Sequence, residues 1–444
     1  MALLVLASML AMTFQSELQS PSASWTAPED GLPPCSRRMY ANLDVSPFHG
    51  EDGLLFLTGL SAIEGQTTWR SNDRGLTWDA VLDLTDWYPN AGTTGKLVML
   101  SVPSPTGLTA FMRGGFAYPG GGLLVMLQSF DSGDTWSFLQ MCDQSLEYCR
   151  NWDRLYYFTN EPDTWFVARY ETYTEFEADI LRWSGGESFT TVWQETGATS
   201  LAISTNYAND HLLYANLYPA SQSLNTSFIR SFDGGETWED ASGNGLCPGV
   251  GADLHFSPDF ANDRTVFALQ YGSIFKSIDG GNTWRYLYPP GGAACQSPPR
   301  EESVWELALS PAFVTDNTMY FTVNDDSPFE ARLYVSSDGG ETWQPILQIP
   351  GTITDLIVAE NPPGAPPQST LPAGGIGRPW TAGWPRRPAS RNTYYFPIAL
   401  ARGPQPRPLT LFIEAGTPVP GSYRYRSDDG GLTWQCLNLP PEES

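Results

Sequence analysis

The feature that most constrains the fold is an eight-residue pattern, S-x-D-x-G-x-T-W, which the chain repeats six times. In the copy at 336–343 the pattern lies between two short runs of strand-forming residues, 332–335 and 343–347. A turn flanked by such runs predicts a β-hairpin, with glycine where the backbone needs a positive φ. A degenerate seventh copy spans 182–189. The six complete copies begin at Ser71, Ser129, Ser231, Ser277, Ser336 and Ser427.

The aspartate of each copy is predicted to be structural. At a turn, Asp accepts hydrogen bonds from the backbone N–H groups just downstream and so fixes the loop. A catalytic or metal-binding site needs one such constellation, whereas this chain repeats it. No cysteine and histidine spacing typical of zinc occurs, and no glycine-rich cofactor motif, so no metal and no cofactor are predicted. The structural aspartates are Asp73, Asp131, Asp233, Asp279, Asp338 and Asp429.

A second repeated element precedes several of these hairpins. Residues 257–263 and 310–316 both read S-P-x-F and end in Asp, and each lies between two apolar runs. One unit is therefore strand a, an S-P-x-F turn, strand b, a loop, strand c, the eight-residue hairpin and strand d. This is a four-stranded antiparallel propeller blade. The seven copies predict an all-β, seven-bladed propeller, forming a single domain over residues 35–440.

The last unit carries a Pro- and Gly-rich insertion at 361–391, which is predicted to be an irregular loop. Strand a of that unit is either 353–359 or 394–400, and the choice decides on which face the insertion emerges. The S-P-x-F turns and the hairpins share one face of a propeller, and the variable loops share the other. Loops on a rigid scaffold commonly carry function, so the second face is the predicted functional one.

The eight-residue pattern is identified as the Asp-box, or BNR repeat. From about residue 40 to 438 the chain resembles the Asp-box β-propellers, which include sialidases, xyloglucanase-type glycoside hydrolases, the sortilin luminal domain and a photosystem II assembly-factor propeller. The resemblance implies the fold more than any one function, because these proteins share the box and differ in activity. It implies no catalytic residue, because the F/Y-R-I-P motif of sialidases is absent here. Xyloglucanase-type enzymes place substrate between two propellers, and this chain has room for one.

The charge balance limits the partners. Lys and Arg total 24 against 49 for Asp and Glu, so the net charge is −25. Nucleic acid and anionic membrane surfaces are disfavoured, because both need clustered positive charge. Residues 1–24 read as a signal peptide and linker, with an apolar run too short to span a membrane. We therefore expect a secreted, periplasmic or cell-surface protein with no membrane insertion after signal removal.

The six cysteines fall in or beside connections between successive blades. Their even number and the predicted export favour disulfides over metal binding or catalysis. Fifteen pairings are possible in principle. The expected ones are Cys35 with Cys436, Cys142 with Cys149, and Cys247 with Cys295.

The sequence favours a non-catalytic module that binds a protein or glycan through its loop face, most simply as a monomer. Aromatic side chains are common anchors for such ligands, and acidic residues accompany them. The three histidines lie outside any nucleophile signature. The alternatives are a glycoside hydrolase with unassigned carboxylates and an assembly factor for a membrane complex. The candidate ligand-binding residues are Trp87, Tyr88, Phe116, Tyr118, Asp325 and Asp326.

Overall fold

The computed structural model describes residues 40 to 439 with gaps. The segments omitted within that range are 47–48, 60–66, 84–91, 94–97, 105–106, 119–120, 140–153, 160, 162–163, 170–178, 185–189, 196, 222–225, 243, 249–250, 293–294, 297, 300–301, 327–328, 362–408 and 417–421. The expected signal peptide and linker at 1–24 and nearly all of the insertion lie outside the described residues. The predicted domain boundaries at 35 and 440 lie outside them too and stay a prediction.

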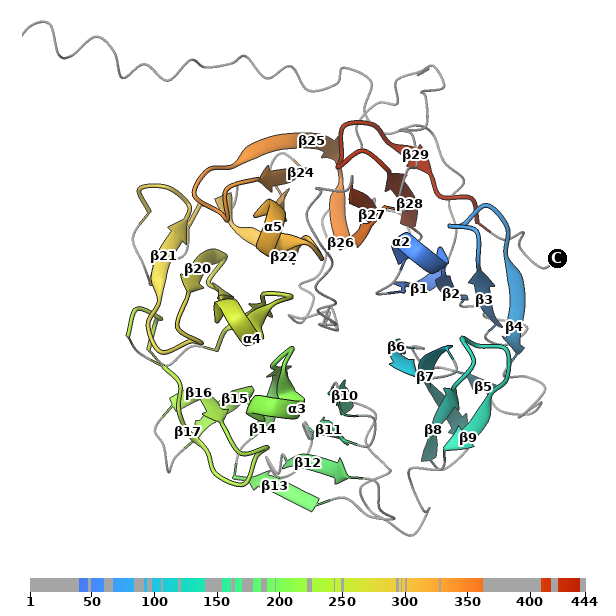
Figure 1. Ribbon diagram of the computed structural model, residues 1–444, viewed down its shortest axis with the longest axis horizontal. Coiled ribbons are helices and arrows are strands. Elements are labelled where there is room, and N and C mark those ends of the chain that lie inside the picture. The colour runs from blue at the N-terminus through green and yellow to red at the C-terminus, as the bar shows by residue number, and fades with distance from the viewer. Residues whose placement is uncertain are drawn as a thin grey trace, which may run out of the picture.

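Among the described residues, six four-stranded antiparallel sheets form the blades of a propeller, each with its strands in chain order (Figure 1). The first strand of each blade is innermost in the ring. Blade 1 consists of β1 (Tyr40–Val45), β2 (Leu55–Gly59), β3 (Thr67–Ser71) and β4 (Asp79–Asp83). Blade 2 consists of β10 (Arg154–Phe158), β11 (Thr164–Arg169), β12 (Asp179–Ser184) and β13 (Thr190–Gln194). Blade 3 consists of β14 (Gly197–Ile203), β15 (Leu213–Ser221), β16 (Thr226–Ser231) and β17 (Glu239–Asp240). Blade 4 consists of β18 (Asp253–Phe256), β19 (Val266–Gln270), β20 (Ser273–Ser277) and β21 (Arg285–Tyr288). Blade 5 consists of β22 (Val304–Leu309), β23 (Met319–Asp326), β24 (Phe329–Ser336) and β25 (Gln344–Pro350). Blade 6 consists of β26 (Thr352–Glu360), β27 (Leu409–Gly416), β28 (Ser422–Ser427) and β29 (Gln435–Cys436).

The prediction of seven four-stranded blades is wrong in its number, because the box at Ser129 belongs to a five-stranded sheet between blades 1 and 2. Strand β7 is 12 residues long, so two strands pair along different parts of one edge. Strand β6 pairs with 107–113 of β7, and β5 pairs with 116–117. The strands of this sheet are β5 (Gly92–Thr93), β6 (Val98–Ser104), β7 (Gly107–Tyr118), β8 (Gly121–Ser129) and β9 (Ser137–Leu139).

The Asp-boxes are hydrogen-bonded turns, as predicted. In blade 5, Ser336 donates its hydroxyl to Oδ1 of Asp338 (2.8 Å) and accepts the Gly340 amide (2.8 Å). Asp338 in turn accepts the Thr342 amide (2.9 Å) and hydroxyl (2.6 Å). The same bonds recur in the other five boxes, so the carboxylate fixes the turn between the third and fourth strands.

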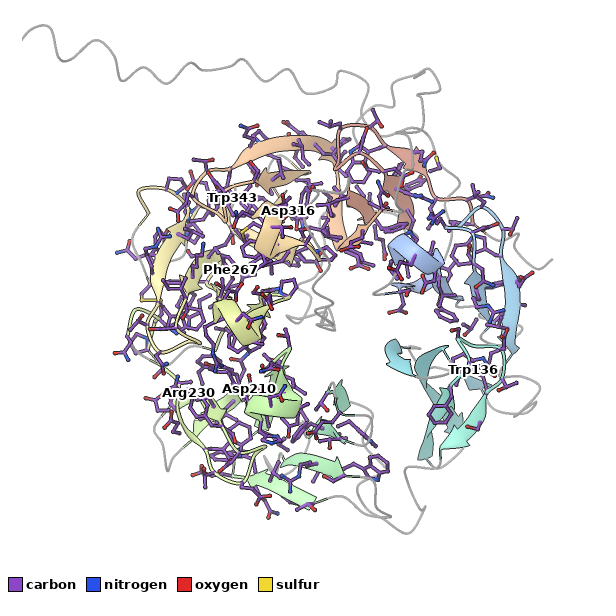
Figure 2. All side chains as sticks on the ribbon, viewed as in Figure 1. Trp136, Asp210, Arg230, Phe267, Asp316 and Trp343 are labelled. Carbon is purple, nitrogen blue, oxygen red and sulfur yellow. A yellow bond between two sulfur atoms is a disulfide. The ribbon has the colours of Figure 1, made fainter. Side chains whose placement is uncertain are left out.

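The S-P-x-F turns form one-turn helices that are tied to the boxes. In blade 4, Ser257 donates to Asp263 (2.5 Å), which also accepts the Thr265 amide (2.8 Å). The carbonyl of Arg264 then accepts the amide of Gly280 in the box (2.9 Å). Figure 2 shows Asp210 and Asp316 on equivalent turns of blades 3 and 5, nearer the ring centre than Arg230 and Trp343. These helices are α2 (His49–Asp52), α3 (Tyr207–Asp210), α4 (Phe260–Asp263) and α5 (Phe313–Asp316).

Apolar side chains fill the seams between neighbouring blades. Phe267 of blade 4 packs in one cluster with Leu307 and Phe321 of blade 5. Trp343 of the blade 5 box joins this cluster, with its ring 4.5 Å from that of Phe321. Each fully buried side chain of this kind contributes about 1.5–3 kcal/mol, and it is buried only when the blades stack. The box Trp of blade 5 therefore packs against the core between the blades.

Side chains close the ring between blade 6 and blade 1. The Arg426 guanidinium donates to the carbonyl of Arg74. Trp78 donates its indole N–H to the carbonyl of Asn438 (2.6 Å), and the Asn438 amide donates to the carbonyl of Leu76 (2.7 Å). All four strands of blade 6 come from the C-terminal part of the chain and all four of blade 1 from the N-terminal part, so no shared sheet joins them.

The last blade settles the face of the insertion. Strand β26 contains 353–359, so this alternative for the first strand is correct and 394–400 is not needed. The insertion connects β26 to β27, the place of the S-P-x-F turn in other blades. It therefore leaves from the end of the blade that carries the boxes, where Asn361 donates to the carbonyl of Asp428 (2.6 Å).

One predicted disulfide, Cys247 with Cys295, is confirmed. Cys436 is also disulfide-bonded, but Cys35 lies outside the described residues, so their pairing stays a prediction. The pairing of Cys142 with Cys149 lies outside them as well. Nowhere in the described ranges is a helix long and apolar enough to cross a membrane.

Candidate functional site

The two ends of each blade define two faces of the propeller. In blade 5, helix α5 and the Asp-box lie at one end, and the turn between β23 and β24 lies at the other. We call these the box face and the loop face. Among the described residues, five of the six blades carry the same Asp-box hydrogen bonds on the box face, so functional differences between blades are expected on the loop face.

The predicted aromatic anchors do not form a described site. Trp87 and Tyr88 lie outside the described residues. The glycines around Phe116 and Tyr118 suggest a loop in the sequence, but this interpretation is wrong, because both residues belong to β7 and pair with β8. Gly114 and its neighbours keep the hairpin register up to the tip of the hairpin.

The predicted acidic pair lies at the end of a strand. Asp325 and Asp326 are the last residues of β23, opposite Glu330 and Phe329 of β24. Asp325 is buried, with 7% of its surface exposed. This places the pair at the loop face but gives Asp325 little contact with solvent, and ligand binding by these residues stays a prediction.

The innermost strands carry a polar residue at one equivalent place near the loop face. In blades 1, 3, 4 and 5 it comes four residues before the turn serine (Ser257 in blade 4), and in blade 6 it follows the same β-bulge as in blade 5. A bulge re-aims the side chains beside it. The spacing from the turn serine was readable in the sequence and would have identified four of these residues, but not Asp355, because blade 6 has no turn serine. They are Asn42, Ser200, Asp253, Glu306 and Asp355.

In blade 6 this position begins a row of charged residues across the sheet. Asp355 pairs in register with Glu414, and Glu414 with Arg424. Glu414 and Arg424 form an ion pair (3.1 Å) with side chains only 8% and 2% exposed. Ile413 and Ala415 pack toward blade 5, so Glu414 between them faces the seam with blade 1. Two carboxylates and a guanidinium thus lie side by side at this seam.

Between blades 4 and 5, two large aromatic side chains are exposed. Trp305 occupies the bulge of β22 and is 63% exposed, and Tyr271 in the tight turn after β19 is 47% exposed. The Val304 amide donates to the carbonyl of Gly272 (2.9 Å), which holds this turn against the start of β22. The sequence reasoning missed both residues, because Trp305 looked like an ordinary strand residue.

Asp253 and His255 lie at the same seam. Leu254 and Phe256 pack against the core between blades 3 and 4, so the two titratable residues of β18 face blade 5. Asp253 keeps contact with solvent, but surrounding protein atoms desolvate it and raise the pKa of its carboxyl. Burial lowers the pKa of His255 to about 4, so its imidazole is neutral at neutral pH.

No group of three or more metal-ligating side chains is found among the described residues.

Comparisons with known proteins match the repeat and the fold. The family model of the BNR/Asp-box repeat matches residues 334–345. A xyloglucanase from Hypocrea jecorina is 25% identical over 280 residues, which cover 55% of this chain and 33% of that enzyme. This chain therefore matches about a third of the length of that relative.

Among solved structures, a prolyl endopeptidase superposes with a TM-score of 0.52 at 11% identity, covering 90% of this chain and 49% of the other. The GH74 enzyme of Niastella koreensis gives 0.48 at 14% identity, covering 92% and 67%. The expected non-catalytic role is not confirmed by these comparisons. The matched repeat and the ring of four-stranded antiparallel sheets make this chain a member of the BNR-repeat (Asp-box) β-propeller superfamily.

Proposed function

We propose that this protein is an exported glycoside hydrolase that acts on a glycan at its loop face. The sequence similarity to a xyloglucanase favours this alternative over the non-catalytic module that the sequence alone suggested. The Cys247–Cys295 disulfide agrees with an oxidising, extracytoplasmic location.

The observation that carries the proposal is the carboxylate pair of blade 6. Asp355 and Glu414 are direct cross-strand neighbours, and such residues have Cβ atoms about 4.5–5.5 Å apart. Retaining glycosidases need two carboxyl groups about 5–5.5 Å apart. Direct register between strands is therefore a geometry that can meet this requirement.

The surroundings of the two carboxylates suggest their roles. Arg424 stabilises the negative charge of Glu414 through the buried ion pair, which suits the nucleophile. Asp355 is half-buried and more accessible to solvent than Glu414, which suits the group that protonates the leaving group and then activates water.

The test is hydrolysis of a panel of soluble polysaccharides, measured as released reducing ends, with Asp355→Asn and Glu414→Gln. We expect the turnover rate of both variants to fall by about 100-fold or more, the usual contribution of a positioned acid or base. Glu330→Gln is the matched control, because Glu330 also pairs with an arginine, Arg332 (2.9 Å), near the loop face of blade 5. It should stay within about twofold of wild type, since it removes no proposed catalytic group.

Asp355→Asn is the decisive variant, because Glu414→Gln leaves Arg424 buried beside a neutral partner and lowers stability as well. Full activity in a folded Asp355→Asn protein would contradict the proposal, and so would absence of hydrolysis across the panel. Binding without products would instead support a second candidate, glycan recognition without turnover. The exposed Trp305 favours that candidate, because aromatic faces bind sugars without chemistry.

A further inference from the structure

The seam between blades 4 and 5 carries an exposed aromatic pair, Trp305 and Tyr271, whose positions are fixed by the backbone. The Val304 amide bonds to Gly272, so the Tyr271 turn and the Trp305 bulge belong to one connected edge of the loop face. Most residues of this size are buried in the described blades, as Phe267 and Phe321 are. Exposed aromatic faces offer contact area for sugar rings and for cations.

One carboxylate faces the seam beside this pair. Asp253 faces it from β18, whereas Glu306 of β22 lies on the same side of its strand as Ala308, which packs toward blade 6. His255, the other titratable residue of β18 facing the seam, is neutral at neutral pH because burial lowers its pKa to about 4. The aromatic pair therefore lies in negative surroundings once Asp253 is ionised.

The charge at the seam discriminates between classes of glycan. Acidic sugars would be repelled by Asp253 and by a chain with a net charge of −25. A neutral sugar could stack on Trp305 but would make no use of the Asp253 carboxylate. A sugar with a protonated amine can do both, because aromatic faces and carboxylates each attract ammonium groups.

We infer that the site formed by Trp305, Tyr271 and Asp253 binds a glycan that carries free amino groups. This inference rests on the proposed function, in that it names the substrate class of the same loop face. It is separate from the carboxylate pair of blade 6, which would perform the chemistry.

The experiment compares the binding of matched oligosaccharides by calorimetry at mildly acidic pH, where the amine is protonated. The probes are glucosamine oligomers, their N-acetylated counterparts, cello-oligosaccharides and oligogalacturonate. We expect the free-amine oligomers to bind about tenfold or more tightly than the N-acetylated ones, in line with a desolvated cation–π contact. Trp305→Ala and Asp253→Asn should each remove most of that preference.

The control is Phe130→Ala, which removes an aromatic side chain that is 50% exposed beside the Asp-box at Ser129. It should leave the binding constants unchanged. Equal affinity for free-amine and N-acetylated oligomers would overturn the inference, as would an unchanged preference in Trp305→Ala. Tighter binding of a lysine-rich peptide than of any sugar would overturn it too, in favour of a protein ligand.

The affinity should also depend on pH in a defined direction. It should weaken as the pH falls through the raised pKa of Asp253, at a higher pH than an ordinary aspartate titrates, and Asp253→Asn should abolish this step. The other titratable groups of the described residues at this seam are His255, Tyr271 and, within its apolar cluster, Tyr288 and Tyr334. All titrations are made with Asp355→Asn protein, so a failure of hydrolysis and a failure of amine recognition give separate results.

Discussion

Replacing Asp338 by alanine tests whether the box carboxylates stabilise the turns or perform chemistry. Asp338 accepts three hydrogen bonds, from the Ser336 hydroxyl and from the amide and hydroxyl of Thr342. Because the carboxylate is exposed, water can replace part of the hydrogen bonding that the substitution removes. The net contribution of each bond to stability is therefore taken from the lower end of the usual range. At about 0.5–1 kcal/mol each, Asp338→Ala should lower the free energy of unfolding by about 2 kcal/mol.

The loss should depend on pH in a way that follows from the same bonds. Desolvation acts in the opposite direction, but hydrogen bonds from Thr342 and Ser336 lower the pKa of Asp338 to about 2. A carboxyl with a lowered folded-state pKa stabilises the fold fully above its unfolded pKa of about 3.8, and this contribution disappears as the pH falls through the folded pKa. The stability difference between wild type and Asp338→Ala should therefore shrink as the pH falls from about 4 to about 2.

The assay is urea unfolding at several pH values, together with hydrogen exchange of the Thr342 amide as a local measure. Asp259→Ala is the matched control, because Asp259 accepts one side-chain bond, from Asn262 (2.6 Å). It should cost less than about 0.5 kcal/mol, as surface substitutions usually do. A stable Asp338→Ala protein that has lost hydrolytic activity would refute the structural role. Faster exchange at Thr342 with activity intact would support it.

Two further changes probe the blade and the ring. Gly340→Ala places a methyl group 2.5 Å from Cδ2 of Leu287 at a φ of +93°, whereas at Gly291, with a φ of +75°, nothing lies within 4 Å of such a methyl group. Gly291→Ala should therefore lower the free energy of unfolding only by the backbone contribution of about 1–2 kcal/mol, and Gly340→Ala should lower it clearly more. Urea unfolding curves of the two variants measure this difference. Equal losses in the two variants would contradict the steric argument. Arg426→Ala removes the guanidinium that donates to Arg74 across the closure, so limited proteolysis should cut faster at the seam of blades 6 and 1. Unchanged cleavage would mean that apolar packing alone closes the ring.

The sequence predicted the blades well because their hairpins are fixed by bonds between near neighbours. Ser336, Asp338 and Thr342 satisfy one another within seven residues, and Ser257 with Asp263 does the same in the turn at the other hairpin. Short-range bonds of this kind leave a fixed spacing in the chain. Both turns could therefore be recognised without knowing what packs around them.

The prediction failed where the outcome depends on residues far apart. The extra strand of the second sheet depends on the length of β7, which its glycine-rich sequence concealed. The exposure of Trp305 depends on a bulge against β23, and that of Tyr271 on a turn held by the neighbouring blade. A residue of each type is more often buried or packed, so its identity alone gave no signal.

The comparison of blades within this one chain separates what the fold needs from what it leaves free. The turn serine and its aspartate recur because each blade needs the same hydrogen bonds, as in Ser257 and Ser310. Four residues earlier, at an equivalent backbone position, the side chain changes from serine in blade 3 to aspartate in blade 4 and glutamate in blade 5. The fold fixes the backbone at this position but does not require one particular side chain there. The loop-face ends of the innermost strands are therefore the positions at which this propeller can carry a function in addition to its structural role.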